Sequence, residues 1–240
     1  MRINIIIPNF NKAKFLEKCL KSCSNQNYDN FNIIFIDNES SDNSMEIVKK
    51  FKKSCKVDLI IDSAKNIYPH CWEECLEAAF KYCDGEYYTI VGSDDYISEN
   101  YLNNFAKSID VNNKPKIAQS AMTWYQKEIP IHYTEYKYSS IEELKIELIK
   151  RCAVNSPTVF YHTSLIKMND IRREPDLYSG ASDYDYYCQI VNKGFNIFLI
   201  KDIGYCYNVN EEQATWNMHK SEINYSNVII KKWKNIWNID

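Results

Sequence analysis

The 240-residue sequence predicts an α/β fold with a mixed, mostly parallel, Rossmann-like sheet that is flanked by helices. The first half predicts this most directly, because short runs rich in β-branched residues alternate there with segments of helical periodicity. Three of the predicted strands end in residues that break a strand or carry a polar side chain, at Pro8, Asp37 and Asp94. The second half is less regular, which indicates mixed topology and a part devoted to a different ligand.

Four strands and three helices are predicted in the first half. The strands cover residues 3–7, 32–36, 57–61 and 87–91, and the helices cover residues 12–24, 43–53 and 70–83. Pro8 ends the first strand because proline lacks the N–H that a sheet ladder needs. In an open α/β sheet, the carboxyl ends of the parallel strands form the edge where ligands bind. We therefore expect Pro8, Asp37 and Asp94 to converge on one edge.

The second half is predicted to contain four more strands and two helices. The strands cover residues 116–124, 158–162, 195–200 and 204–209. Ser140 and Glu143 form the capping-box pattern that opens a helix ending near Arg151. A second helix begins at residues 182–185 and ends at Gly194, because glycine suits the position after a helix C-cap.

No internal repeat or low-complexity linker separates the two halves. We therefore expect one compact domain over residues 1–218, followed by an amphipathic helical tail over residues 219–240. Hydrophobic residues make up 45% of the chain, which is enough for a substantial core. With 29 basic and 32 acidic residues, the formal charge of −3 gives no global electrostatic reason to expect a nucleic-acid partner.

The sequence predicts a cytoplasmic protein. The chain enters a strand at once, without the charged-then-apolar pattern of a signal peptide. No apolar stretch reaches the roughly 20 residues that span a bilayer. The nine cysteines are scattered through apolar segments, which is typical of small hydrophobic residues in a reducing compartment. Cys71 and Cys75 beside His70 have helical spacing, so a structural zinc site is disfavoured.

The strand at residues 87–91 is followed closely by two adjacent carboxylates, Asp94 and Asp95. Two like charges this close repel, so they require a cation, a hydrogen-bond network or a raised pKa. Their hard oxygen atoms suit Mg2+ or Mn2+, which keep several waters and share their remaining positions with substrate phosphates. The alternative is a solvated turn in which Asp94 caps the following helix. These residues alone leave both interpretations open.

Three motifs occur in order within the first 100 residues. Residues 5–11 read IIIPNFN, residues 34–42 read IFIDNESSD and residues 85–95 read GEYYTIVGSDD. This ordered set resembles the family 2 glycosyltransferases with the GT-A fold, whose N-terminal halves read roughly IxxPxYN, IIVDDGSxD and GEYIxFLDxDD. The combination is far more specific than any one motif. The resemblance implies a nucleotide-sugar-binding half over residues 1–110 and an acceptor-binding half over residues 111–218.

The resemblance implies a donor site along the carboxyl edge. Pro8, Asn9 and Phe10 would border the nucleotide base, and Asp37 would accept a hydrogen bond from it. A carboxylate there suits the imide N–H of uracil, which favours a UDP-sugar as the donor. A strand-ending turn is the alternative role for Asp37. Lys65 would approach the pyrophosphate in place of the family's Arg-Asn pair, and an ordinary surface lysine is its alternative.

The resemblance also implies a divalent cation, Mn2+ or Mg2+, bound at Asp94. The cation would bridge the diphosphate and act as a Lewis acid that stabilises the departing nucleoside diphosphate. Ser93 is assigned to the same donor site. Asp95 would bond the sugar or orient the metal shell.

Two departures from the family pattern weaken the predicted metal site. Gly92 replaces the first aspartate of the DxD triplet, so the cation would rely on Asp94, the diphosphate and water. Residues 207–215 resemble a family segment that often reads YRxHxxSxS, whose histidine contacts the cation or the diphosphate, and Asn210 stands at that place. An amide oxygen still binds a hard cation, though more weakly. His219 is a candidate substitute, with a surface or structural role as its alternative.

Inverting sugar transfer requires a base that deprotonates the acceptor hydroxyl as it attacks the anomeric carbon opposite the leaving group. Residues 180–185 read GASDYD and resemble the family's helix-opening Glu-Asp motif, with Ser182 in place of the glutamate. The resemblance implies that Asp183 is the base, and Asp185 is the reserve candidate. The alternative role for Asp183 is a helix N-cap or a first-turn carboxylate, where the helix dipole would lower its pKa.

The tail places Ile229, Trp233, Ile236 and Trp237 on one side of a basic helix over residues 223–237. Such a helix suits the inner face of a membrane, where a peripheral protein would meet lipid-linked acceptors. The alternatives are packing against the domain and pairing with a second subunit in a homodimer.

Together these motifs predict an inverting, metal-dependent glycosyltransferase that moves one sugar from a nucleotide-sugar to a hydroxyl of a glycan acceptor. The resemblance implies a role in the biosynthesis of a bacterial surface polysaccharide, such as a capsule, or of lipooligosaccharide. The alternative is a catalytically silent nucleotide-sugar-binding partner of another transferase, because Gly92, Ser182 and Asn210 depart from the family pattern. A sugar nucleotidylyltransferase is disfavoured, because residues 8–12 are not a glycine-rich, arginine-containing loop.

Overall fold

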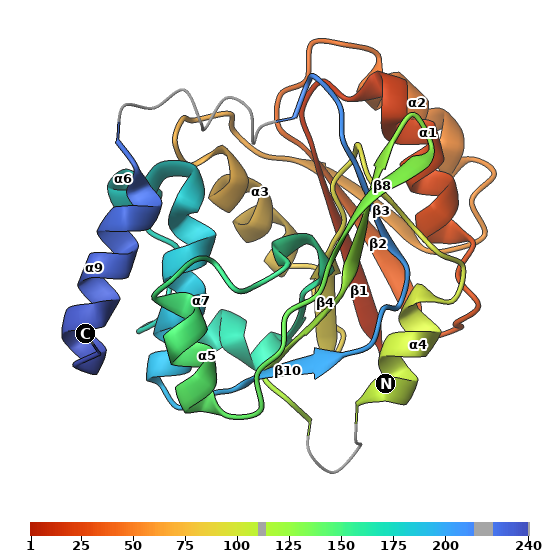
Figure 1. Ribbon diagram of the computed structural model, residues 1–240. Coiled ribbons are helices and arrows are strands. Elements are labelled where there is room, and N and C mark those ends of the chain that lie inside the picture. The colour runs from red at the N-terminus through yellow and green to blue at the C-terminus, as the bar shows by residue number, and fades with distance from the viewer. Residues whose placement is uncertain (110–113, 214–222, 240) are drawn as a thin grey trace.

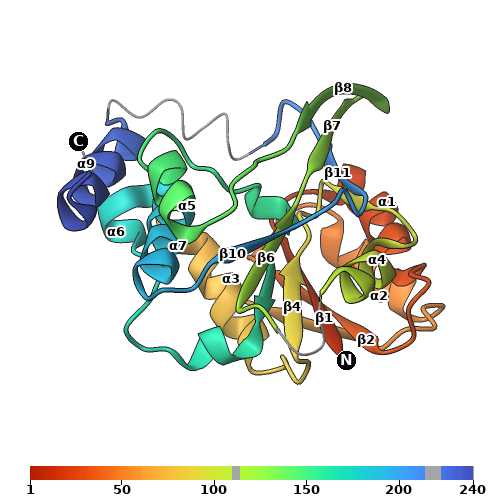
Figure 2. The same cartoon turned by 60° about the horizontal axis from the view of Figure 1, so that its bottom comes forward.

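The computed structural model describes residues 1–109, 114–213 and 223–239, and Figures 1 and 2 show it from two directions. Its centre consists of two sheets. The seven-stranded sheet has the strand order β10-β6-β9-β4-β1-β2-β3, and the four-stranded sheet has the order β5-β11-β7-β8. The strands of the larger sheet are β1 (Ile3–Asn9), β2 (Phe31–Asp37), β3 (Leu59–Ser63), β4 (Tyr87–Ile90), β6 (Ile117–Ser120), β9 (Phe160–His162) and β10 (Ile197–Ile200). Those of the smaller sheet are β5 (Tyr96–Ile97), β7 (Met122–Gln126), β8 (Ile129–Thr134) and β11 (Tyr205–Asn208).

Helices surround these sheets. The α-helices are α1 (Ala13–Ser24), α2 (Ser44–Lys52), α3 (Cys71–Phe80), α4 (Tyr101–Ser108), α5 (Ile141–Leu148), α6 (Pro175–Tyr178), α7 (Ser182–Asn192) and α9 (Tyr225–Trp237). Short 3-10 helices cover Ser156–Thr158, Thr163–Lys167 and Ser179–Ala181.

The larger sheet is mixed and mostly parallel, as the sequence predicts. Strand β1 pairs in parallel with β2 and β4, β2 with β3, and β10 with β6. Strand β9 runs antiparallel to both β4 and β6. Every residue of β1 and β2 is buried, which is expected for parallel strands that are covered on both faces.

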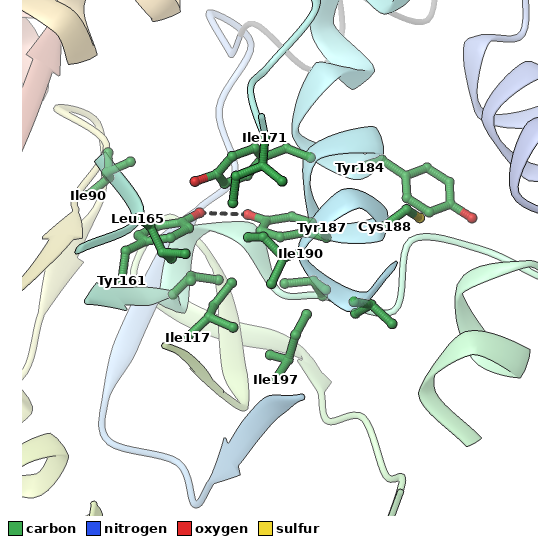
Figure 3. Packing of buried hydrophobic residues seen from close by; sticks show 14 of the residues in the cluster. Ile90, Ile117, Tyr161, Leu165, Ile171, Tyr184, Tyr187, Cys188, Ile190 and Ile197 are labelled. Atoms are coloured by element: carbon green, nitrogen blue, oxygen red, sulfur yellow. Dashed lines mark hydrogen bonds between the residues drawn. The ribbon is translucent and has the colours of Figure 1, made fainter. Parts of the chain in front are cut away.

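Helices cover both faces of the larger sheet (Figure 1). Ile5 packs in the cluster that includes Leu16 of α1, whereas Ile6 belongs to the cluster formed with α3, α5, α7 and α9. Successive strand residues point to opposite faces, so one strand feeds both cores. Figure 3 shows the second cluster, in which the hydroxyl groups of Tyr161 and Tyr187 form a hydrogen bond of 2.9 Å.

The strand predicted over residues 116–124 is two strands, which corrects the prediction. Strand β6 ends at Ser120 in the larger sheet, and β7 begins at Met122 in the smaller one. The Ser120 N–H donates to the Thr158 hydroxyl at 3.0 Å, and the Ser120 carbonyl accepts from Asn155 Nδ2 at 2.9 Å. These side chains occupy the backbone groups that would otherwise continue the ladder, so the chain changes sheets here.

The sequence pattern does not predict strand β8. It pairs antiparallel with β7 through a tight turn, where Lys127 and Glu128 have positive φ angles of 48° and 67°. Two-residue hairpins of this kind usually carry Asn-Gly or Asp-Gly, because those residues tolerate positive φ best. The unusual Lys-Glu turn hides the hairpin in the sequence.

Two predicted helix ends agree with the structure. Gly194 has a φ of +85°, its N–H donates to the Val191 carbonyl, and the Phe195 N–H donates to the Ile190 carbonyl. This is the Schellman arrangement that ends a helix. At the start of α5, Ser140 Oγ accepts from the Glu143 N–H at 3.1 Å.

The C-terminal helix α9 packs against the domain, beside α7 in both views (Figures 1 and 2). Ile229 and Trp233 are buried, whereas Ile236 is 47% exposed. Packing against the domain is therefore the alternative that the structure shows, and membrane contact and homodimerisation remain predictions. Within the described residues, no helix is long and apolar enough to cross a membrane. Residues 219–222 of the predicted tail lie outside the described residues.

Candidate active site

The ends of β1 and β2 form a buried polar pair at the carboxyl edge. Asn9 lies opposite Asp37 in the parallel register, and its Nδ2 donates to Asp37 Oδ1 at 3.0 Å. The other carboxylate oxygen of Asp37 accepts from the Ser40 N–H at 2.9 Å. Asn9 Oδ1 is buried without a hydrogen-bond partner among the described residues. Pro8 is buried and Phe10 is 47% exposed, so the predicted base-binding residues run from the core to the surface.

Lys65 lies at the rim of this edge. Its side chain is 73% exposed, and its ammonium pairs with Glu39 Oε1 at 3.0 Å. The backbone carbonyl of Lys65 accepts from Asn38 Nδ2 at 2.7 Å, which fixes the loop after β3 against the end of β2. The structure therefore places Lys65 beside the predicted base pocket, with its charge directed to Glu39.

Asp95 is a buried carboxylate that links the loop after β4 to strand β11 through hydrogen bonds. It is 5% exposed, its Oδ2 accepts from the Tyr205 hydroxyl at 2.8 Å, and its Oδ1 accepts from the Asn208 N–H at 2.8 Å. Burial, together with the neighbouring charge of Asp94, raises the Asp95 pKa well above its ordinary value. Ser93 is also buried. Both oxygen atoms of Asp95 thus serve the protein scaffold.

Asp94 lies at the centre of a polar cluster that the sequence only partly predicts. Its Oδ2 accepts from Asn210 Nδ2 at 3.1 Å, so the structure brings these two predicted site residues together. The ammonium of Lys12 lies 3.2 Å from the same oxygen. Lys12 stands just before α1, in the loop that follows β1, and the motif comparison assigns it no role.

Asp94 offers one carboxylate to a possible cation, and its described surroundings add few ligands. The described residues contain no group of three or more His, Cys, Asp or Glu side chains that could hold a metal. Asn210 Oδ1 accepts from the Glu212 N–H at 3.0 Å, and Asp95 is engaged elsewhere. Mg2+ is often bound by one or two carboxylates together with substrate phosphates. Asp94 provides one such carboxylate. His219 lies outside the described residues.

Asp183 lies in the first turn of α7 and is partly exposed. Its Oδ2 accepts from the Ser156 hydroxyl at 2.7 Å, and its Oδ1 accepts from the Tyr184 N–H at 2.7 Å. The N-cap of α7 is Ala181, so the N-cap role considered for Asp183 is wrong. Asp183 is instead a first-turn carboxylate that accepts a hydrogen bond from Ser156.

Asp185 faces the opposite way and fastens α9. It is fully buried, and Lys232 Nζ donates to its two oxygens at 2.8 and 3.1 Å. Trp233 Nε1 and Gln189 Nε2 each donate to it at 2.7 Å. Burial opposes the charge of Lys232, but its hydrogen bonds to Asp185 and Tyr178 raise its pKa. The reserve candidate is thus enclosed within the protein.

Glu73 of α3 contacts the start of α7. No sequence motif predicts this contact. Ser182 Oγ donates to Glu73 Oε1 at 3.0 Å, across a separation of 109 residues. Nearby, the hydroxyl of Tyr68 lies 3.1 Å from that of Ser179, and Tyr68 is 81% exposed. The loop before α3 therefore contacts the segment that carries Asp183. No local sequence signal marks these contacts.

Arg173 contributes a positive charge to this region. Its guanidinium interacts with Tyr161, Tyr187, Asp183 and Glu73. Burial disfavours the charged guanidinium, but these neighbours outweigh burial and raise its pKa. Arg173 therefore remains a cation beside Asp183.

Comparison with known proteins agrees with the motifs. Residues 4–167 match the family model described as glycosyl transferase family 2. TarS, a poly(ribitol-phosphate) beta-N-acetylglucosaminyltransferase of Staphylococcus aureus, is 24% identical over 214 residues, covering 88% of this chain and 36% of TarS. The Escherichia coli protein WfaP, a UDP-Glc:alpha-D-GlcNAc-diphosphoundecaprenol beta-1,3-glucosyltransferase, is 25% identical over 229 residues, covering 95% of this chain and 85% of WfaP. The chain thus spans about a third of the length of TarS.

Solved structures share the fold. The crystal structure of S. aureus TarS 1–349 in complex with UDP superposes with a TM-score of 0.71 at 22% identity, covering 98% of this chain and 71% of that one. The mannosyltransferase PcManGT from Pyrobaculum calidifontis, in complex with GDP-Man and Mn2+, gives a TM-score of 0.62 at 16% identity, covering 90% and 59%. These neighbours identify the GT-A fold. The family model matches most of the chain. The chain therefore belongs to glycosyl transferase family 2.

Proposed function

We propose that the chain is an inverting glycosyltransferase that transfers a single sugar from a UDP-sugar to a hydroxyl of a glycan or lipid-linked glycan. One observation supports this proposal most directly. In this family 2 protein, the Asn9–Asp37 pair and the Asp94 cluster lie at neighbouring strand ends on the carboxyl edge of the larger sheet. We assign residues 1–110 to the donor and residues 111–218 to the acceptor. The pathway we propose is the synthesis of a bacterial surface polysaccharide, such as a capsule, or of lipooligosaccharide.

The donor base is proposed to lie against Pro8, Asn9, Phe10 and Asp37. Asn9 Oδ1, which has no hydrogen-bond partner in the described part of the chain, and the fixed Asp37 carboxylate provide acceptors for a base that carries an N–H group. Uracil has such a group. That TarS was solved with UDP, and that WfaP is named for UDP-Glc, supports the choice of uridine. Lys65 is assigned to the rim of this pocket.

We assign Mn2+ or Mg2+ to Asp94, with the diphosphate supplying further oxygens. Asn210 would be a weak second ligand only after its amide rotates, because its Nδ2 faces Asp94 and its Oδ1 accepts from the Glu212 N–H. When bound, the cation supplies Lewis-acid stabilisation of the departing diphosphate. Asp95 acts through the scaffold, because it holds β11, and with it Asn208, against the loop that carries Asp94. Ser93 belongs to the same loop. That PcManGT was solved with Mn2+ supports a divalent cation in this fold.

Asp183 is proposed to accept the proton of the acceptor hydroxyl. The Ser156 hydroxyl holds one of its oxygens at 2.7 Å, which orients the carboxylate. Arg173 contributes a positive charge to the same region. Attack on the anomeric carbon from the side opposite the diphosphate then inverts its configuration.

The protein is proposed to act in the cytoplasm, as a peripheral protein at the inner face of the membrane if α9 contacts lipid.

The alternative proposal is a catalytically silent nucleotide-sugar-binding partner. The departures at Gly92, Ser182 and Asn210 favour it, since each removes a charged or metal-binding group of the family pattern.

The deciding experiment is thermal stabilisation by UDP, GDP and several UDP- and GDP-sugars, each with Mn2+ and with EDTA, since a bound ligand raises stability by mass action. We expect a shift with UDP and with one UDP-sugar. The same donor is then tested for UDP release in the presence of glycan acceptors. Binding without turnover on any acceptor would support the silent partner, and no shift with any nucleotide would reject both proposals.

A further inference from the structure

Lys12 and Asp94 form an enclosed ion pair at the carboxyl edge of the larger sheet. The ammonium lies 3.2 Å from Asp94 Oδ2, and the two side chains are 14% and 15% exposed. The same ammonium donates to the backbone carbonyl of Glu212 in the segment after β11. An enclosed pair is screened by salt less than a surface pair. Lys12 therefore sets the charge around the carboxylate to which the metal is assigned.

The backbone on either side of Lys12 is fixed by the neighbouring loop. Asn11 has a positive φ of 51°, and its Oδ1 accepts from the Ser41 N–H at 2.8 Å. On the other side, the Ala13 N–H donates to Asp42 Oδ2 at 2.9 Å. The lysine stem therefore starts from a defined point, so little loop ordering is needed when its ammonium contacts a ligand.

Other lysines of this region direct their charge elsewhere. Lys14 in the first turn of α1 is exposed. Lys18 pairs with Glu128 at 3.0 Å, and Lys65 pairs with Glu39 at 3.0 Å. Lys12 differs from these three because its ammonium contacts the proposed metal ligand directly.

We propose that Lys12 is the built-in cation of the donor site and binds the diphosphate of the nucleotide donor directly. In the free protein its ammonium neutralises Asp94. When a nucleoside diphosphate enters, the ammonium contacts the phosphate oxygens, so part of the binding does not depend on a divalent metal. A divalent cation must compete with the ammonium for Asp94 Oδ2. This inference rests on the proposed donor site.

The chain's departures from the family pattern agree with this role. Gly92 and Asn210 replace an aspartate and a histidine, so Asp94 is left with fewer metal-binding neighbours. Asn210 directs its amide Nδ2, a hydrogen-bond donor, to Asp94. An ammonium and an amide N–H both satisfy a carboxylate that has lost metal-binding neighbours. The Lys12 ammonium thus supplies positive charge at the position where the family pattern has a bound metal ion.

The test compares the wild type and three variants by titration calorimetry. Each protein is titrated with UDP in the presence of EDTA and, separately, with MnCl2 in the absence of nucleotide. Lys12→Met removes the charge and keeps most of the stem, Lys12→Arg keeps the charge, and Lys14→Met, two residues later in the first turn of α1, is the matched control. We expect the wild type, Lys12→Arg and Lys14→Met to bind UDP in EDTA, and Lys12→Met to bind it at least about tenfold more weakly. We also expect Lys12→Met to bind Mn2+ more tightly than the wild type, because Asp94 has lost its counter-ion.

Several results would overturn the inference. If EDTA abolishes UDP binding to the wild type and Mn2+ restores it equally in Lys12→Met, the donor site stands and the role of Lys12 is wrong. Equal UDP affinity of wild type and Lys12→Met in EDTA has the same meaning. If the wild type binds no UDP with EDTA or with Mn2+, the proposed donor function itself fails. Should Lys12→Met fold poorly, the Lys12→Met/Asp94→Asn double variant removes the unpaired charge, and loss of UDP binding relative to Asp94→Asn alone then supports the inference.

Discussion

Lys232 of α9 donates hydrogen bonds to both carboxylate oxygens of Asp185 in α7, at 2.8 and 3.1 Å. Asp183, the proposed base, lies two residues earlier in the same helix. Residues two apart on a helix point in different directions. The two carboxylates therefore have separate roles: Asp185 holds α9 against the domain, and Asp183 faces Ser156.

Replacing Asp185 with Asn should destabilise the fold. The change leaves the Lys232 ammonium without its counter-charge, and removing one partner of a buried ion pair costs roughly 3 kcal/mol. Because the Lys232 side chain is 31% exposed, we expect a loss somewhat below that value. Urea unfolding measures the free energy of unfolding.

The matched control is Asp170→Asn, which removes an exposed ion pair with Lys193. Exposed pairs contribute about 0–1 kcal/mol, so this variant should remain close to the wild type. Equal stability of the two variants would contradict the role of Asp185. UDP binding should be unchanged in both.

The stability of the protein should fall at mildly acidic pH because of His162. Its Nδ1 accepts from the Ser164 N–H at 3.1 Å, and its ring packs edge-on against Tyr87 with the ring centroids 5.1 Å apart. Burial, together with the charge of Lys116, lowers the His162 pKa. The folded state thus favours the neutral ring, whose stability contribution is present above about pH 6.5 and is lost as the pH falls through the folded-state pKa.

His162→Asn tests this prediction, since its Oδ1 accepts the same Ser164 N–H at every pH. Urea unfolding of both proteins at pH 8, 6 and 5 should show the wild type losing stability relative to His162→Asn as the pH falls. Parallel curves over this range would show that His162 does not carry the effect.

Asp183→Asn should nearly abolish sugar transfer while leaving donor binding intact. A positioned general base contributes roughly 10²- to 10⁴-fold to a rate, so kcat should fall by that factor. Ser156→Ala should lower kcat less, because it removes the hydrogen bond of 2.7 Å that orients the carboxylate and leaves the base in place. Asp176→Asn, whose side chain is 74% exposed, is the control. Wild-type kcat in Asp183→Asn would make another group the base.

Local patterns in the sequence predict the first half of the fold well. The β-branched runs and apolar helix faces give the strands and helices up to β4, because these patterns repeat within a few residues. The predicted end of the first strand at Pro8 is wrong, since β1 continues in register with β2 through Pro8 to Asn9. Prediction is weaker after Asp95. The chain changes sheets at Ala121 because side chains of Thr158 and Asn155 take the backbone groups of Ser120. That exchange joins residues far apart in the sequence, so no short window contains it.

The candidate site divides in the same way. The sequence proposes Asp37, Asp94 and Asp183 as site residues through motifs at strand ends and at a helix start, and these roles remain predictions. It assigns Asp95 and Asp185 to the same site, and the structure buries both against partners in other elements, as it also buries Asp37 against Asn9. Adjacent carboxylates look alike in a sequence, and their exposure depends on which side chains pack against them.

The sequence by itself determined the family, the alternation of strands and helices, and the motif residues at the strand ends and at the start of α7. The tertiary structure alone decided which groups meet those motifs: Lys12 at Asp94, Ser156 at Asp183 and Glu73 at Ser182. The physical reason is range. Secondary structure follows from patterns a few residues long, whereas the charge and orientation of a carboxylate depend on neighbours that folding brings from distant parts of the chain.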